Sequence, residues 1–126
     1  MRREDLVGVW RLVAFHELDD ADGRGEGPLG EAPRGRLVYT ENGHVSVNMM
    51  RTAGEAGGTR YMGYAGTWRL TGGQVVHRIE VTPRPDWVGT EQSRDAVLEG
   101  NRLTLRADTL LQGVQHRRVL VWERLG

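Results

Sequence analysis

Two residues in the second half of the chain have side chains that could bind or transform a small molecule, His77 and Arg94. An imidazole titrates near neutral pH and can accept or donate a proton. A guanidinium can hold a carboxylate, an enolate or a carbonyl oxygen through its planar fork of N–H donors. Each residue interrupts a row of alternating apolar residues, so we expect both to face an apolar interior.

The role of His77 has three interpretations that the sequence leaves open. A buried histidine can be a core residue that bonds to a neighbour, such as the indole of Trp68 or a backbone carbonyl. It can also contact a bound ligand, or transfer a proton to a substrate.

Arg94 needs a partner, because a buried guanidinium without one is very costly. No inward-facing acid is evident near it in the sequence. A ligand oxygen is one candidate partner. Alternatively, Arg94 lies at the rim of the interior or pairs with a loop acid such as Glu55 or Asp86.

The clearest element that could position these side chains is a hairpin of residues 61–70 and 74–82 around a Gly-Gly turn. Such a turn pairs Trp68 with His77. The charged residues of both strands then fall on the outer face, which supports this register. The predicted inward residues are Tyr64, Gly66, Trp68 and Leu70 on one strand, and Val75, His77, Ile79 and Val81 on the other.

Two further hairpins follow the same logic. Residues 35–40 and 44–50 flank a turn that ends in glycine, and residues 87–98 and 103–107 flank a Gly-Asn turn. The predicted inward residues are Leu37, Tyr39, Val45, Val47 and Met49 in the first, and Gln92, Arg94, Ala96, Leu98, Leu103, Leu105 and Ala107 in the second.

The first strand is predicted over residues 7–16 and the last over residues 116–124. If Arg11 faces water, alternation places Trp10, Leu12, Ala14 and His16 inside. Residues 19–35 are rich in turn formers and predict a long loop. The outward apolar residues would form a dimer patch, which makes a homodimer possible, or lie under that loop; they are Val9, Val13, Phe15 and Val38.

These patterns predict one all-β domain over residues 1–126, with eight antiparallel strands in up-and-down order and a short N-terminal helical turn over residues 2–6. Eight strands can close into a barrel that holds side chains or one small ligand. An open sandwich is the alternative architecture.

Gly8-Val9-Trp10 and Arg124 are similar to a lipocalin signature, in which the Trp plugs one barrel end and the Arg packs across it. The rest of the chain resembles the bacterial and fungal lipocalin-like domain family of calycin barrels. The resemblance implies the barrel fold more strongly than a function, because family members differ in role. The stretches that carry it include residues 6–13, 33–40, 42–47, 64–68, 76–77, 87–90 and 121–124, together with Arg94.

Composition excludes several classes of function. Seventeen basic and seventeen acidic residues leave no basic excess for nucleic acid or an anionic membrane surface. The absence of cysteine rules out disulfides and thiolate metal sites, and we expect neither a metal nor a cofactor. The N-terminal segment has no signal-peptide pattern and no apolar run could span a bilayer, so a cytoplasmic location is expected.

An apolar interior with a few polar groups is typical of a small-molecule site. We therefore predict that the chain binds a small, mostly apolar metabolite with a polar end. The alternative is a cofactor-free cyclase or isomerase for a polyketide-like or terpenoid-like substrate of natural-product biosynthesis, with His77 and Arg94 as catalytic residues. A third interpretation is a barrel filled by its own side chains. The predicted ligand-binding residues are Tyr39, Val47, Met49, Tyr64, Trp68, His77, Gln92, Arg94 and Trp122.

Overall fold

The computed structural model describes residues 1–53, 58–111 and 113–126. Its regular structure is almost entirely β, with two single-turn 3-10 helices, η1 (Arg3–Asp5) and η2 (Pro85–Trp87). No helix within the described ranges is long and apolar enough to cross a membrane. The strands are β1 (Gly8–Leu18), β2 (Arg24–Glu26), β3 (Arg34–Tyr39), β4 (His44–Met50), β5 (Tyr61–Thr71), β6 (Gln74–Val81), β7 (Glu91–Glu99), β8 (Arg102–Leu111) and β9 (Val114–Arg124).

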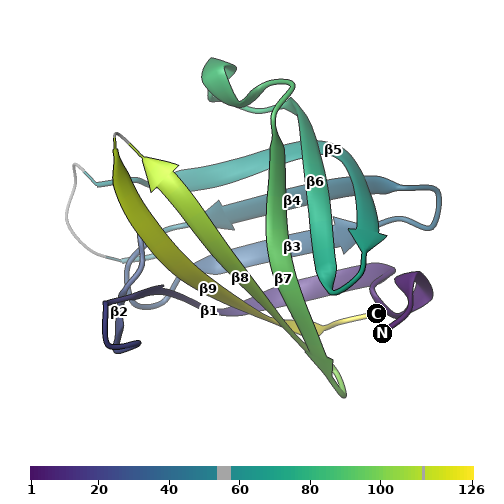
Figure 1. Cartoon of the computed structure of the whole chain (residues 1–126), viewed down its shortest axis with the longest axis horizontal. Coiled ribbons are helices and arrows are strands. Elements are labelled where there is room, and N and C mark those ends of the chain that lie inside the picture. The colour runs from purple at the N-terminus through teal and green to yellow at the C-terminus, as the bar shows by residue number, and fades with distance from the viewer. Residues whose placement is uncertain (54–57, 112) are drawn as a thin grey trace.

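Eight of these strands form a closed antiparallel barrel. Strands β1 and β3 to β9 pair in sequence order, and β9 pairs with β1 to close the sheet. Figure 1 shows β1, β3, β4 and β5 on one side, with β6 to β9 crossing them on the other. This closure confirms the predicted up-and-down barrel, and the alternative of an open sandwich is wrong. Strand β2, which the sequence did not predict, adds a short hairpin on the end of β1.

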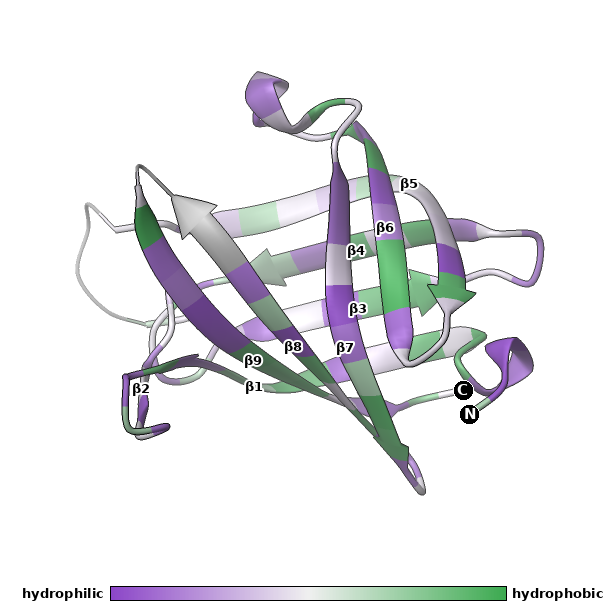
Figure 2. Ribbon diagram, in the orientation of Figure 1, coloured by the Kyte–Doolittle hydropathy of each residue, from purple (hydrophilic) through white to green (hydrophobic). Residues whose placement is uncertain are grey.

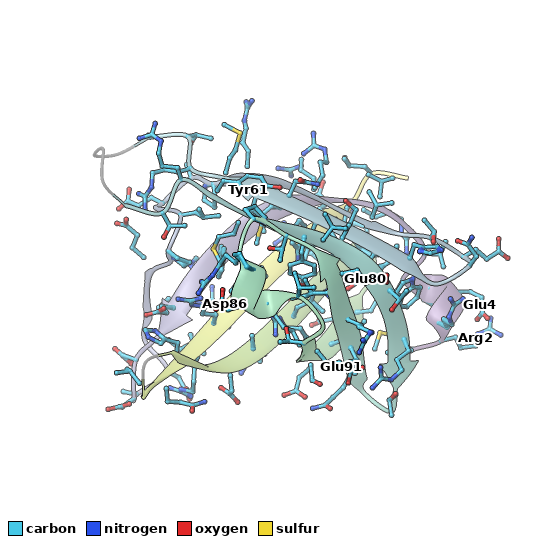
Figure 3. All side chains as sticks on the ribbon, turned by 90° about the horizontal axis from the view of Figure 1, so that it is seen from above. Arg2, Glu4, Tyr61, Glu80, Asp86 and Glu91 are labelled. Carbon is cyan, nitrogen blue, oxygen red and sulfur yellow. The ribbon has the colours of Figure 1, made fainter. Side chains whose placement is uncertain are left out.

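The predicted hairpin registers are confirmed. Trp68 lies opposite His77, and Leu98 lies opposite Leu103. Hydrophobic and hydrophilic residues follow one another along the barrel strands (Figure 2), and burial alternates in the same way along β3 and β4. Charged side chains such as Glu80 and Glu91 cover the outside (Figure 3).

A β-bulge corrects the predicted orientation of Val81. Ala65 lies opposite Val81 but the next residue, Gly66, lies opposite Ile79, so β6 has one extra residue. The extra residue reverses the alternation beyond it. Val81 is therefore 68% exposed instead of facing the interior.

A second irregularity corrects the first strand. The pairing of β1 with β9 shifts between Leu12 and Ala14, so the alternation changes there. Phe15, predicted to face outward, is buried and lines the interior. It therefore cannot belong to a surface dimer patch.

The segment predicted as a loop over residues 19–35 also contributes to the interior, because its Leu29 is part of the hydrophobic core.

The strand predicted over residues 87–98 begins later than expected. Pro85 starts the 3-10 turn η2, and strand pairing begins only at Glu91. Proline is favoured at the first position of a helical turn and has no N–H for a sheet ladder. Trp87 consequently lies on a turn at one end of the barrel, where η2 projects beyond the strands in Figure 1.

The opposite end of the barrel is closed by η1, which confirms the predicted N-terminal turn. The indole N–H of Trp10 donates to the carbonyl of Leu6 over 3.0 Å. The Arg124 guanidinium lies 4.3 Å from the Trp10 ring centroid and donates to the carbonyls of Val7, at 2.9 Å, and Asp5. The Trp plug and the Arg across it, which the resemblance implied, are both present.

We expect Arg124→Ala to reduce the free energy of unfolding by about 2–3 kcal/mol, because it removes a cation–π contact and leaves two carbonyls without their donor. Urea unfolding of the variant measures this loss. Arg24→Ala is the control, since Arg24 is exposed on β2. Equal unfolding midpoints for the two variants would show that Arg124 does not stabilise the closed end.

Candidate ligand-binding site

A cavity of about 60 Å³ lies inside the barrel, lined mainly by apolar side chains. Seven of the nine predicted ligand-binding residues line it: Val47, Met49, Tyr64, His77, Gln92, Arg94 and Trp122. The other two, Tyr39 and Trp68, are buried in the core but do not line the cavity. The interior is thus not completely filled by side chains.

His77 is held between two tyrosines. It is 2% exposed, and its Nε2 lies 2.6 Å from the hydroxyl oxygen of Tyr39 on β3. Its Nδ1 lies 2.6 Å from the hydroxyl oxygen of Tyr64 on β5. The predicted alternative partner, Trp68, donates its indole N–H to the carbonyl of Thr40 instead. His77 is therefore a fully bonded core histidine that also forms part of the cavity wall.

Burial keeps all three groups neutral. Burial, together with the positive charge of Arg94, lowers the pKa of His77 to about 3. Burial also raises the pKa of Tyr39 and of Tyr64 above the ordinary value, although Arg94 opposes the rise. At neutral pH the imidazole has one proton, and both phenols keep theirs.

Arg94 lies on β7, half-buried at the cavity wall. It donates to the side-chain oxygen of Gln92 and, over 3.3 Å, to the carbonyl of Ser93. No carboxylate among the described residues forms an ion pair with it. Of the two acids considered from the sequence, Asp86 pairs with Arg84 at 3.4 Å, and Glu55 lies outside the described residues.

A second guanidinium in the cavity wall, Arg118 on β9, already has a carboxylate. Its Nε donates to Glu17 over 3.0 Å, and His116 lies 3.0 Å from the same oxygen. Burial works to raise the pKa of Glu17, but the hydrogen bonds and charges of Arg118 and His116 outweigh it and hold the pKa below its usual range. Arg118 is thus neutralised by Glu17, whereas no carboxylate among the described residues neutralises Arg94.

The sequence interpretation missed four lining residues that matter for the site: Phe15, Met62, Trp87 and Arg118. Arg118 could have been found, because it lies two and four residues before the inward-facing Leu120 and Trp122. The inward orientation of Phe15 results from the irregularity in β1, and the position of Trp87 results from the η2 turn. The alternation of apolar and polar residues predicts neither feature. Trp87 packs edge-on against Tyr64, with 6.5 Å between the ring centroids.

A metal centre finds no support in the described part of the chain, which contains no cluster of three or more His, Cys, Asp or Glu side chains suited to a metal ion. The four histidines lie on different strands, and His77 has both ring nitrogens engaged.

A closed eight-stranded barrel with one end sealed by Trp and Arg, and with a mostly apolar cavity, defines the lipocalin-like class of β-barrels. The family model described as "Lipocalin-like domain" matches residues 7–59 and 55–125. The chain belongs to this family.

Individual relatives are more distant. The chain is similar to the 4'-hydroxy-3'-methoxypropiophenone carrier protein of Aspergillus oryzae, with 32% identity over 54 residues. That match covers 41% of this chain and spans about half (49%) of the length of the relative. Among solved structures, the chain is similar to a variant of the fluorescent protein UnaG, with 15% identity and a TM-score of 0.46 over 98% of this chain and 99% of the other.

Proposed function

We propose that this protein binds one small, mostly apolar molecule inside the barrel and holds its polar end at Arg94. The observation that carries the proposal is the charge of the cavity wall. Arg118 has Glu17 as its carboxylate, but Arg94 contacts only neutral oxygens within the described residues. An uncompensated guanidinium beside apolar side chains favours a ligand oxygen that is negatively charged or strongly polarised.

The size of the cavity sets a condition on binding. About 60 Å³ is far below the 300–1,000 Å³ that is usual for pockets that enclose a drug-sized ligand. A ligand larger than a few atoms therefore requires the wall to move. Met49 and Met62 are unbranched and adaptable, and Trp87 lies on the short η2 turn. We infer that these side chains yield when the ligand enters.

The Aspergillus relative suggests the first probe. Its name specifies an aryl ketone, which combines an apolar ring system with a carbonyl oxygen. A molecule of this kind satisfies both requirements of the cavity proposed above, an apolar body and an oxygen for Arg94. We propose 4'-hydroxy-3'-methoxypropiophenone as a test ligand and as a model of the ligand class.

Ligand binding is preferred over a cyclase or isomerase that uses His77 as its proton shuttle. An efficient acid or base at neutral pH needs a pKa near that pH. Burial instead lowers the pKa of His77 to about 3, and both ring nitrogens contact tyrosine hydroxyls. A substrate proton would have no free imidazole nitrogen to reach.

Native mass spectrometry of the protein purified from its own source, followed by identification of bound compounds, is the direct test. An apolar compound with a carbonyl or carboxylate oxygen is the expected result. Turnover of that compound by the wild-type protein would contradict a role limited to binding.

We expect Arg94→Ala to weaken binding of the aryl ketone by about 10-fold or more, because it removes a charge-assisted hydrogen bond. The quenching of tryptophan fluorescence reports binding, since Trp87 and Trp122 line the cavity. Arg106→Ala is the matched control, with an exposed arginine on β8. Equal affinities for the two variants would exclude Arg94 as the anchor.

A further inference from the structure

The polar side chains of the cavity wall share a property that narrows the ligand class. Trp122 is 1% exposed and lines the cavity, and its indole N–H is buried with no hydrogen-bond partner among the described residues. An unsatisfied buried donor is costly and in native structures calls for an explanation. A ligand acceptor in the cavity would supply the missing partner.

The Tyr–His–Tyr group determines what Tyr64 offers to the cavity. Neutral His77 donates through one ring nitrogen and accepts through the other. If Nε2 carried the proton, the Tyr39 oxygen would accept it, and the hydroxyl proton of Tyr39 would need a different acceptor. Tyr39 is 1% exposed, and the described residues provide no such acceptor. The favoured tautomer therefore has its proton on Nδ1.

In that tautomer the direction of each hydrogen bond is fixed. Tyr39 donates its hydroxyl proton to Nε2 of His77, and the Nδ1–H of His77 donates to the oxygen of Tyr64. The hydroxyl proton of Tyr64 is then left over. Tyr64 is half-buried and lines the cavity, so it can direct that proton to a molecule inside.

Gln92 completes the pattern. Its side-chain oxygen accepts a hydrogen bond from Arg94, which leaves the amide N–H groups as its uncommitted polar atoms. Trp122, Tyr64, Gln92 and Arg94 therefore all present donors.

We propose that the cavity is a donor-only site that selects a ligand whose polar end is a hydrogen-bond acceptor, a ketone, enolate or carboxylate oxygen, bound by the Tyr64 hydroxyl and the Trp122 indole. This proposal rests on the proposed ligand-binding function and specifies its chemistry. An amine brings further donors and a positive charge next to Arg94, and leaves the donors of the wall unpaired. Such a mismatch discriminates strongly between otherwise similar ligands.

Three probes with one phenylpropyl skeleton test the selection: propiophenone, 1-phenylpropylamine and propylbenzene. Relative to the ketone, we expect the amine to bind at least about 100-fold more weakly and the hydrocarbon about 10-fold more weakly. Equal affinity for amine and ketone would overturn the donor-only proposal while leaving ligand binding intact. If none of the three compounds binds, the proposed function itself fails for this ligand class, and the selection proposed here fails with it.

The same titrations in variants assign the donors. Tyr64→Phe and Trp122→Phe are each expected to weaken ketone binding by about 10-fold more than propylbenzene binding, because only the ketone can accept the lost hydrogen bond. Tyr61→Phe is the control, because Tyr61 is exposed and donates to Asn48 outside the cavity. Equal losses for ketone and hydrocarbon would indicate damage to packing and overturn the assignment.

One measurement requires no ligand. The ¹⁵N chemical shifts of the His77 imidazole in the free protein distinguish its two tautomers. We expect a protonated Nδ1 and an unprotonated Nε2. A proton on Nε2 would reverse both hydrogen bonds and remove the Tyr64 donor, so it would overturn this part of the proposal whatever the titrations show.

Discussion

Lowering the pH from about 7 to about 4.5 is expected to reduce the free energy of unfolding by roughly 2–3 kcal/mol through His77 alone. The pKa of this residue is about 3 in the folded protein and 6.5 in its ordinary state. Between pH 6.5 and pH 3, His77 binds a proton in the unfolded chain but stays unprotonated in the folded protein. The stabilisation is therefore complete above pH 6.5 and is lost progressively as the pH falls toward 3.

The surroundings of His77 explain why its imidazole stays neutral in the folded state. Tyr39 from β3 and Tyr64 from β5 occupy the ring nitrogens, and Arg94 from β7 adds a positive charge nearby. Among these neighbours no carboxylate is available to stabilise an imidazolium. Burial accounts for most of the lowered pKa, and the guanidinium adds to it.

Urea unfolding of the wild type and of His77→Gln between about pH 7 and pH 4.5 measures this effect, because a glutamine can bond to the tyrosines but does not titrate. The variant is expected to lose most of the pH dependence in this interval. The lowered pKa of Glu17 gives a stabilisation that is lost only at lower pH, below the ordinary carboxyl value.

His44→Gln is the control for the loss of a histidine as such, since His44 is exposed at the start of β4. It is expected to retain the wild-type pH dependence. If His77→Gln and the wild type lose stability in parallel from about pH 6.5 downward, His77 is not the source of the pH dependence.

The general architecture could be predicted from sequence because its determinants are local. Turn residues fix where hairpins reverse, and alternation fixes which face is apolar. The Gly-Gly turn after Thr71 was sufficient to place Trp68 opposite His77, as the structure has them. The number of strands was compatible with closure but left an open sandwich as the alternative, and the pairing of β9 with β1 decides between them.

Errors occurred where a single residue changes the alternation. A bulge adds one residue to a strand without a distinctive composition, so Phe15 and Val81 were assigned to the wrong faces. The assignment of Trp87 to a strand is wrong because Pro85 starts a 3-10 turn that includes Trp87.

The candidate site was only partly predictable, because its contacts join distant strands. Alternation placed Tyr39, Tyr64 and His77 inside the barrel, but could not show that the two hydroxyls meet opposite nitrogens of one ring. That arrangement depends on barrel curvature and on the register of three strands. Sequence likewise could not show that Glu17 pairs with Arg118 and that no carboxylate among the described residues pairs with Arg94.

The bulge between β5 and β6 gives the second large effect, the replacement of Gly66 by alanine. A Cβ atom at this position would lie 1.8 Å from the backbone oxygen of Arg78 and 3.2 Å from the backbone nitrogen of Glu80. These are main-chain atoms of the paired strand, so no side-chain rotation relieves the clash. The two strands would have to separate at the bulge.

We expect Gly66→Ala to lower the free energy of unfolding by about 3 kcal/mol or more, which thermal or urea unfolding would detect. Because β5 carries Tyr64 and β6 carries His77, separation of the strands also disturbs the hydrogen bond between them. Any folded variant should therefore bind the aryl ketone more weakly than the wild type.

Gly73→Ala is the matched control, because a Cβ atom at Gly73 meets no atom within 4 Å and the residue does not need a positive φ angle. This variant is expected to unfold within about 0.5 kcal/mol of the wild type, as usual for surface substitutions. A similar stability for the Gly66 and Gly73 variants would mean that β6 can move away from β5 at little cost. The bulge would then be an adaptable part of the barrel wall, and the position of Tyr64 against His77 would not depend on it.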